Sequence, residues 1–293
     1  MTEFFKNINK RYKHGNILIK LIFINAIIFI LLETVSIIST LFKIPIPDFS
    51  YYLSVPALIP QLITRPWSII TYMFVHANIF HIFFNMLMLY WFGKIFLTYF
   101  NSRNMGVLYF LGGLGGAILY IAAFNFIPYY IDMKDSIMVG ASGAVMAIVF
   151  ASAFYHPDQK LIFFVFPVKI IYIALALFVI DFFALRDPSN PGGHVAHIGG
   201  AIVGLVFALQ YKKGRDITAW FTSISKFFST LFKPKKKTKM KVKVGGREAD
   251  YEYNRKKNIE QEDIDRILDK IKASGYSSLT KEEKRQLFDA SRK

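Results

Sequence analysis

A serine and a histidine stand inside two separate hydrophobic stretches of the chain, each among small residues. Ser142 lies within Gly140-Ala141-Ser142-Gly143, and His197 lies within Ala196-His197-Ile198-Gly199-Gly200. Polar and ionisable groups are costly inside a bilayer, so their presence there indicates a function by default. A serine hydroxyl becomes a good nucleophile when a base removes its proton, and a neutral histidine can do so near pH 7. The pair predicts a nucleophile and its general base within a membrane.

The composition favours a membrane protein. Of the 293 residues, 54% are hydrophobic, and they are concentrated in long runs. The net charge of +16 could indicate a nucleic-acid partner. Much of that excess flanks the apolar runs, where Lys and Arg set topology and contact lipid headgroups, so we expect membrane lipids and no nucleic acid as partners. The absence of cysteine excludes disulfides, thiolate ligands and thiol nucleophiles.

The apolar runs predict an all-α polytopic membrane protein with a six-transmembrane-helix bundle. The expected spans are residues 16–40, 80–100, 106–127, 141–155, 168–185 and 195–212. The first run is long for a signal peptide and lacks a clean cleavage site, so we take it as a span. Loops on the side of the two termini are richer in Lys and Arg, which predicts that both termini are cytoplasmic.

Four segments follow from this pattern. They are a cytoplasmic N-terminal segment at 1–14, the six-helix domain at 15–212, a basic juxtamembrane linker at 213–245 and a small cytoplasmic helical domain at 246–293. In the last segment, Gly275 is a plausible helix stop, and Thr280 with Glu283 has the spacing of a capping box before a second short helix. We expect a small soluble helical hairpin there.

The topology places the polar groups at one depth. Spans two, four and six all enter from the outer face, so His81 and Asn85, Ser142, and His197 lie near the outer leaflet. A helix from Ser142 to Tyr155 is about 20 Å long against a hydrocarbon thickness of about 30 Å, so Ser142 would lie roughly 10 Å below the outer boundary. Residues 133–141 must then enter the protein as irregular backbone, which requires a protein-lined, water-accessible cavity.

Contact between Ser142 and His197 requires close packing of spans four and six. Gly140 and Gly143 on one side and Gly199 and Gly200 on the other permit this approach. His81 and Asn85 stand at i and i+4 on one helix face, which suits donors for an oxyanion, together with the Ser142 backbone N–H.

The sequence places no acidic residue to orient His197. Glu33 and Asp181 lie near span ends and receive no catalytic role. We therefore expect a Ser-His dyad without a third member.

These motifs, in this order and at a shared depth, resemble the rhomboid intramembrane serine proteases of bacterial type with a C-terminal cytoplasmic appendage. The matching elements are Gly-Ala-Ser142-Gly, Ala-His197-x-Gly-Gly-x-x-x-Gly204, His81-x-x-x-Asn85 and the stretch from Arg65-Pro-Trp67 to His76. The resemblance covers about residues 15–212.

The resemblance implies Ser142 as nucleophile, His197 as general base, and His81 and Asn85 lining the oxyanion hole. It also implies cleavage of transmembrane-helix substrates near the outer membrane face, in a bacterial inner membrane. Separately, we expect no cofactor and no metal. Many members carry an aromatic residue, packed on the catalytic histidine, where this chain has Met146. Methionine can also pack against an imidazole ring.

Three alternatives stay open. A catalytically silent rhomboid-like protein that binds membrane clients would usually lack one of Ser142 and His197. A transporter would carry polar residues through the full membrane depth. A metal site could use His194 and His197 with His76 and His81, but we expect no acidic residue at that depth to complete it. His76 is then interpreted as a hydrogen-bonding residue that tethers the loop.

For 246–293, the alternative to a solvated hairpin is a docking site for a cytoplasmic partner or a second copy. The oligomeric state is left open.

Overall fold

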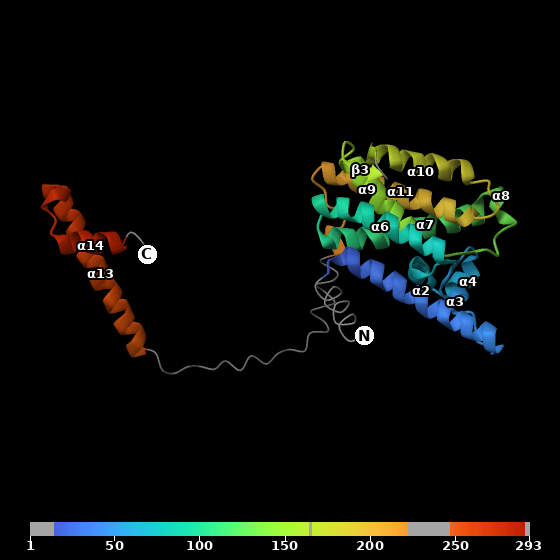
Figure 1. Ribbon diagram of the computed structural model, residues 1–293, viewed down its shortest axis with the longest axis horizontal. Coiled ribbons are helices and arrows are strands. Elements are labelled where there is room, and N and C mark those ends of the chain that lie inside the picture. The colour runs from blue at the N-terminus through green and yellow to red at the C-terminus, as the bar shows by residue number, and fades with distance from the viewer. Residues whose placement is uncertain (1–14, 164–165, 222–246, 291–293) are drawn as a thin grey trace. The chain divides into compact units, whose positions relative to one another are not determined.

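The computed structural model describes residues 15–163, 166–221 and 247–290 (Figure 1). They fall into two compact units that divide between residues 232 and 233. The first unit contains six principal helices. They are α2 (Ile17–Phe42), α6 (Ile79–Tyr99), α7 (Ser102–Phe126), α9 (Ser142–Tyr155), α10 (Ile170–Ala184) and α11 (Pro191–Lys212).

Among the described residues, α2, α6, α7 and α11 are long and apolar enough to cross a membrane. The other two principal helices, α9 and α10, are apolar but shorter, with 14 and 15 residues. The predicted all-α polytopic bundle is confirmed, and each predicted span coincides with one helix to within a few residues.

Helix capping explains where two helices begin earlier than the apolar pattern predicts. The α11 helix starts at Pro191 because the Asn190 side chain accepts a hydrogen bond from the Gly193 backbone N–H, at 3.2 Å, and because proline suits the first helical position. The α7 helix starts at Ser102 because the Asn101 side chain accepts from the Asn104 N–H at 2.9 Å. Apolar periodicity alone does not register such polar first turns.

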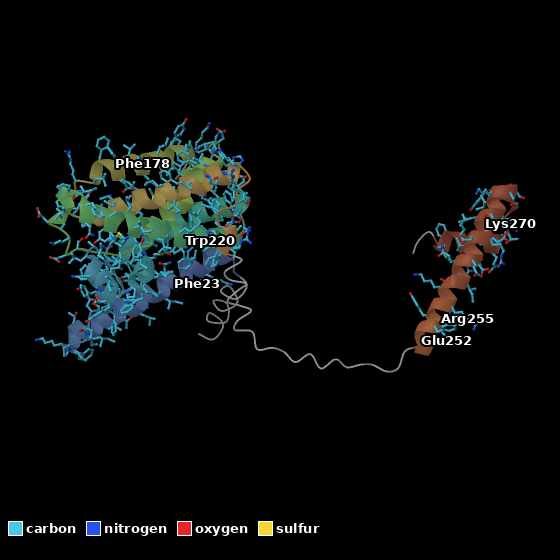
Figure 2. The ribbon with its side chains drawn as sticks, turned by 180° about the vertical axis from the view of Figure 1, so that it is seen from behind. Phe23, Phe178, Trp220, Glu252, Arg255 and Lys270 are labelled. Atoms are coloured by element: carbon cyan, nitrogen blue, oxygen red, sulfur yellow. The ribbon has the colours of Figure 1, made fainter. Side chains whose placement is uncertain are left out.

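The α9 helix forms the centre of the bundle. From Gly143 to Ala153 every residue is buried, and the helix packs against α11, α7 and α6. In Figure 1, α10 and α2 lie on opposite sides of this centre. Phe178 of α10, labelled in Figure 2, packs against Phe150 of α9 with ring centroids 6.2 Å apart.

The long loop between α2 and α6 is ordered by short elements. They are α3 (Phe49–Leu53), β1 (Val55–Pro56), α4 (Ile59–Thr64), α5 (Ser68–Thr71) and the 3-10 helix η1 (Tyr72–Phe74). Arg65 donates to the Tyr51 carbonyl at 2.7 Å, and the Trp67 indole donates to the Tyr52 carbonyl at 3.1 Å. These polar bonds fold the loop onto itself as a compact unit.

Two small antiparallel pairs and one short helix complete the first unit. The β1 strand pairs with β2 (Ile137–Met138), which joins the long loop to the segment before Ser142. The α8 helix (Pro128–Ile131) follows α7, and β3 (Lys160–Phe163) pairs with β4 (Phe166–Lys169) between α9 and α10. The predicted irregular backbone at 133–141 is confirmed apart from the two residues of β2.

The second unit is a helical hairpin of α13 (Arg247–Ser274), η2 (Tyr276–Ser278) and α14 (Lys281–Ala290). The predicted capping box is confirmed: Glu283 accepts from the Thr280 N–H at 2.7 Å, and Thr280 accepts from the Glu283 N–H at 3.3 Å. Lys270 of α13, labelled in Figure 2, donates to Glu283 at 2.8 Å. The Lys270 hydrogen bond, together with the cap, lowers the pKa of Glu283 to about 2. Most of the predicted basic linker, residues 222–245, lies outside the described residues.

Candidate active site

Ser142 is placed at the first residue of α9 by a glycine in a left-handed conformation. Gly140 has φ of +126°, and its N–H donates to the Tyr72 carbonyl at 2.9 Å. A Cβ at this position would lie 2.8 Å from the His81 ring. Only glycine combines this backbone angle with this space, so Gly140 lets the chain turn tightly past His81 into α9.

The α9 and α11 helices pack with their backbones in direct contact, as the small residues predict. A Cβ on Gly200 would overlap the Gly143 carbonyl oxygen, and one on Gly143 would lie 3.2 Å from the Ala196 carbonyl oxygen. Close approach of this kind is what small residues allow between membrane helices. It brings the helix of Ser142 against the helix of His197.

The α7 helix supplies a third small-residue surface that the sequence analysis did not use. A Cβ on Gly116 would lie 2.9 Å from the Ala196 carbonyl oxygen, and one on Gly199 would lie 2.6 Å from the Gly115 carbonyl oxygen. The run Gly112-Gly113-Leu-Gly115-Gly116 was the available signal. Gly199 therefore faces α7, while Gly200 faces α9.

A cavity of about 450 Å³ collects the predicted chemical groups. Its lining is mostly apolar and comes from α6, α9, α10 and α11, with Asn78 and Asn190 from the helix N-termini. Ser142, His197, His81, Asn85 and Met146 all line it. The structure thus brings together side chains from three helices that are far apart in sequence. Contact between Met146 and the His197 ring stays a prediction.

His81 and Asn85 are arranged to offer N–H groups to this cavity. The His81 Nδ1 accepts from the Ala77 N–H at 3.3 Å, so a neutral ring carries its proton on Nε2. That Nε2 atom lies on the side of Gly140, next to Ser142. One Asn85 amide N–H donates to the His81 carbonyl at 2.8 Å, which fixes the amide and leaves its second N–H for a ligand.

The prediction that no acidic residue orients His197 is wrong. Asp181 of α10 is 4% exposed, and its Oδ1 atom lies 2.8 Å from Nδ1 of His197 and 2.8 Å from Nδ1 of His194. Asp181 also lines the cavity that contains Ser142. Asp181 lies near the end of a predicted span and for that reason received no role. Sequence spacing does not tell which neighbouring helix a residue of α10 faces.

The same residues bear on metal binding. Asp181, His194 and His197 present ligand atoms within 4.8 Å of one another, so the expectation of no acid beside these histidines is also wrong. The 2.8 Å separations are hydrogen-bond distances. In this geometry both Nδ1 atoms are used by one carboxylate oxygen, and metal binding would require them to release it.

The predicted role of His76 as a loop tether stays a prediction. Its side chain is buried, and its ring lies edge-on to the His81 ring with centroids 5.1 Å apart. Within the described residues neither ring nitrogen makes a hydrogen bond of standard geometry. The His76 ring therefore supports His81 by packing.

A second, more polar cavity of about 740 Å³ lies beside the first. It is lined mainly by the segment from Met133 to Val139 and by the loop before α11. Asn78, His81 and Asn190 line both cavities. The polar space thus reaches the candidate site from the loop side, where the sequence analysis expects water to enter.

Comparison with known proteins identifies two regions. The rhomboid domain family matches residues 64–213. A family of unknown function, DUF6576, matches residues 248–293.

Curated relatives of the chain include rhomboid proteins. RHOMBOID-like protein 12, mitochondrial, of Arabidopsis thaliana is 30% identical over 161 residues, which is 52% of this chain and 48% of that protein. Rhomboid protein 1, mitochondrial, of Saccharomyces cerevisiae is 27% identical over 159 residues, 52% of this chain and 43% of that protein. Inactive rhomboid-related protein 2 of Caenorhabditis elegans is 28% identical over 185 residues, 61% of this chain and 49% of that protein. The chain thus spans about half the length of these relatives.

Proposed function

The chain belongs to the rhomboid family, and from that premise we propose that it is an intramembrane serine endopeptidase acting through Ser142 and His197. The observation that carries the proposal is the shared cavity of about 450 Å³, which is lined both by a serine at a helix N-terminus and by a histidine from an adjacent helix. His81 and Asn85 line the same space and supply N–H donors.

The proposed reaction is peptide hydrolysis by acyl transfer. The Ser142 hydroxyl attacks the scissile carbonyl as His197 takes its proton, and the resulting oxyanion accepts hydrogen bonds from His81, Asn85 and the Ser142 N–H. His197 then protonates the leaving amine. Water from the second cavity attacks the acyl-enzyme, and His197 again serves as base.

The proposed substrates are transmembrane helices that enter near the outer membrane face. The main cavity is lined largely by apolar side chains such as Phe84, Leu177 and Ile180, so it suits an apolar segment. A helix must unwind before its backbone can reach Ser142, and substrates that unwind easily, with a small residue before the scissile bond, fit this requirement.

The localisation proposed is a multi-pass membrane location with both termini on one side. The predicted bacterial inner membrane receives no support from the relatives, since two of those named above are mitochondrial. Membrane lipids remain the expected surroundings. For the C-terminal hairpin, docking of a cytoplasmic partner or a second copy stays the alternative to a solvated hairpin.

A catalytically silent client-binding protein is the second candidate function. One relative is named an inactive rhomboid-related protein, so membership of the family does not by itself establish catalysis. The presence of both Ser142 and His197 favours the enzyme. The two functions differ in whether the serine is chemically activated.

Labelling with a fluorophosphonate, which reacts with activated serines, distinguishes them. We expect the purified protein to be labelled at Ser142, and Ser142→Ala and His197→Ala to remain unlabelled. A known active rhomboid labelled in parallel serves as the control. If the wild-type chain stays unlabelled while that control reacts, the protein is a silent binder.

A further inference from the structure

We propose that Asp181 is a positioning residue for His197, so that the site works as a Ser-His-Asp triad across three helices. The inference rests on the proposed function. Its geometric basis is the 2.8 Å separation between Asp181 Oδ1 and His197 Nδ1. Asp181 is nearly enclosed, at 4% exposed, and it lines the cavity shared by Ser142 and His197.

The chemistry of the carboxylate fixes the histidine tautomer. An ionised carboxylate only accepts hydrogen bonds, so the His197 Nδ1 atom that faces it must carry a proton. A neutral imidazole has one N–H, which leaves the Nε2 atom with its lone pair free. Nε2 is the atom that must accept the Ser142 proton, so Asp181 selects the reactive tautomer.

The same contact stabilises the charge formed during the reaction. When the Ser142 hydroxyl proton moves to Nε2, His197 becomes an imidazolium beside the Asp181 carboxylate. Asp181 takes up no proton, and the imidazolium returns to its neutral form by passing the Nε2 proton to the leaving amine. Every proton in the cycle passes between Ser142, His197, the substrate and the water that hydrolyses the acyl-enzyme.

His194 provides a matched comparison within the chain. Its Nδ1 atom lies 2.8 Å from the same Asp181 oxygen, and it comes from the same helix as His197. Yet among the described residues that line the cavity with Ser142, His197 is present and His194 is not. If Asp181 only tied α10 to α11, the two histidines would matter alike.

The neighbouring elements contribute one further titratable group. His81 of α6 lines the cavity with His197 and Asp181, and α9 contributes Ser142. Asp181 is the acidic side chain among the described residues lining this space. No other carboxylate there could take over its role in a variant.

The first test compares Asp181→Asn with His194→Asn in the full-length protein. Replacing the orienting carboxylate of a soluble serine protease by an amide costs about 10⁴-fold in kcat. In this protein the Asp181 carboxylate is shared between His197 and a second imidazole, that of His194. We therefore expect a smaller effect, in which Asp181→Asn slows fluorophosphonate labelling of Ser142 by about 10- to 1,000-fold. His194→Asn keeps the contact between Asp181 and His197, so it should slow labelling much less than Asp181→Asn does. With a transmembrane substrate, the loss in Asp181→Asn should fall on kcat, with KM unchanged.

The second test reads the tautomer without any reaction. In ¹⁵N-histidine-labelled protein, NMR should show the His197 resonance as protonated on Nδ1 and bare on Nε2, assigned by its loss in His197→Ala. The Asp181→Asn variant should lose this preference. Because the tautomer is read in the wild-type protein, a folding defect in Asp181→Asn would leave this test decisive.

Several results would overturn the proposal. One is wild-type labelling kinetics in Asp181→Asn; another is a resting His197 protonated on Nε2. Equal losses of labelling and thermal stability in Asp181→Asn and His194→Asn would reduce Asp181 to a helix tether. Stoichiometric zinc in the purified protein would make both Nδ1 atoms ligands instead of donors. Failure of the wild-type protein to label, with the expected NMR tautomer retained, would contradict the proposed function alone.

Discussion

At the scale of single residues, the site depends on hydrogen bonds that fix the direction of two histidine side chains. His197 is held through Nδ1 by Asp181, and His81 is held through its own Nδ1 by the Ala77 N–H. The two rings therefore present different Nε2 atoms: a lone pair on His197 and an N–H on His81. In the proposed mechanism, the base and the oxyanion donor are thus the same residue type, distinguished by their hydrogen-bond partners.

His81→Ala tests the role of the donor. Removing one oxyanion donor from a serine hydrolase lowers kcat by about 10²–10³-fold, and we expect a loss of that size in cleavage of a transmembrane substrate. Substrate KM should change little, because the hydrogen bond strengthens as the oxyanion forms. A variant that kept its kcat would show that His81 merely fills space beside Gly140, where the two residues lie close.

At the scale of helices, glycine positions decide how near the catalytic groups can come. Gly200 meets the Gly143 carbonyl, and Gly199 meets the Gly115 carbonyl. Each helix face thus has a different partner, and α9 is enclosed between α7 and α11. The separation of Ser142 from His197 is set by backbone contact, which leaves little freedom for side-chain adjustment.

Gly200→Ala should disrupt this contact. The added methyl would overlap the Gly143 carbonyl oxygen, so α9 and α11 must move apart. Overpacking of this kind typically lowers the free energy of unfolding by about 1–3 kcal/mol, and displacement of Ser142 should also slow labelling. Thermal unfolding in detergent and labelling kinetics measure the two effects.

Gly106→Ala on α7 is the matched control for Gly200→Ala. Its added methyl would lie 3.4 Å from the Ile17 side chain, an ordinary contact distance. Alanine also favours a helix over glycine, so stability should be kept or slightly increased. If both substitutions lowered the free energy of unfolding equally, the loss in Gly200→Ala could not be attributed to overlap with the Gly143 carbonyl oxygen.

The sequence predicts much of this architecture and misses a specific part of it. Apolar runs reveal the helices, and the motifs around Ser142 and His197 indicate which groups meet. The role of Asp181 is not predicted, because its partners depend on the rotation of α10 against α11, a tertiary property without a local sequence signal. The β1–β2 pairing is not predicted for a similar reason. Val55 and Met138 lie far apart in sequence, and each strand has only two residues, which is too short for a strand pattern.

At the scale of the whole molecule, the chain joins two units of opposite character. The first is a bundle of apolar helices, and many of its large hydrophobic side chains, such as Phe80, Phe126 and Phe183, are exposed, as expected of surfaces that face lipid. The second is a hairpin whose polar contacts include the Lys270–Glu283 ion pair and the Thr280 cap. The chemistry assigned above draws only on residues of the first unit.

Deletion of residues 246–293 therefore separates catalysis from any docking role. Both candidate cavities are lined by residues of the first unit, so we expect fluorophosphonate labelling of Ser142 and the thermal midpoint of the bundle in detergent to stay unchanged. The hairpin's own contacts, such as Lys270 with Glu283, are internal to it, so its removal leaves no broken ion pair of that kind behind. If the hairpin recruits a partner, cleavage by the truncated protein in cells should still fall. A Glu283→Ala variant of the full chain, which breaks the cap and the ion pair, should then reproduce part of that loss. Reduced labelling of the purified truncated protein would instead mean that the hairpin supports the bundle directly, and the division into a catalytic unit and a docking unit would be wrong.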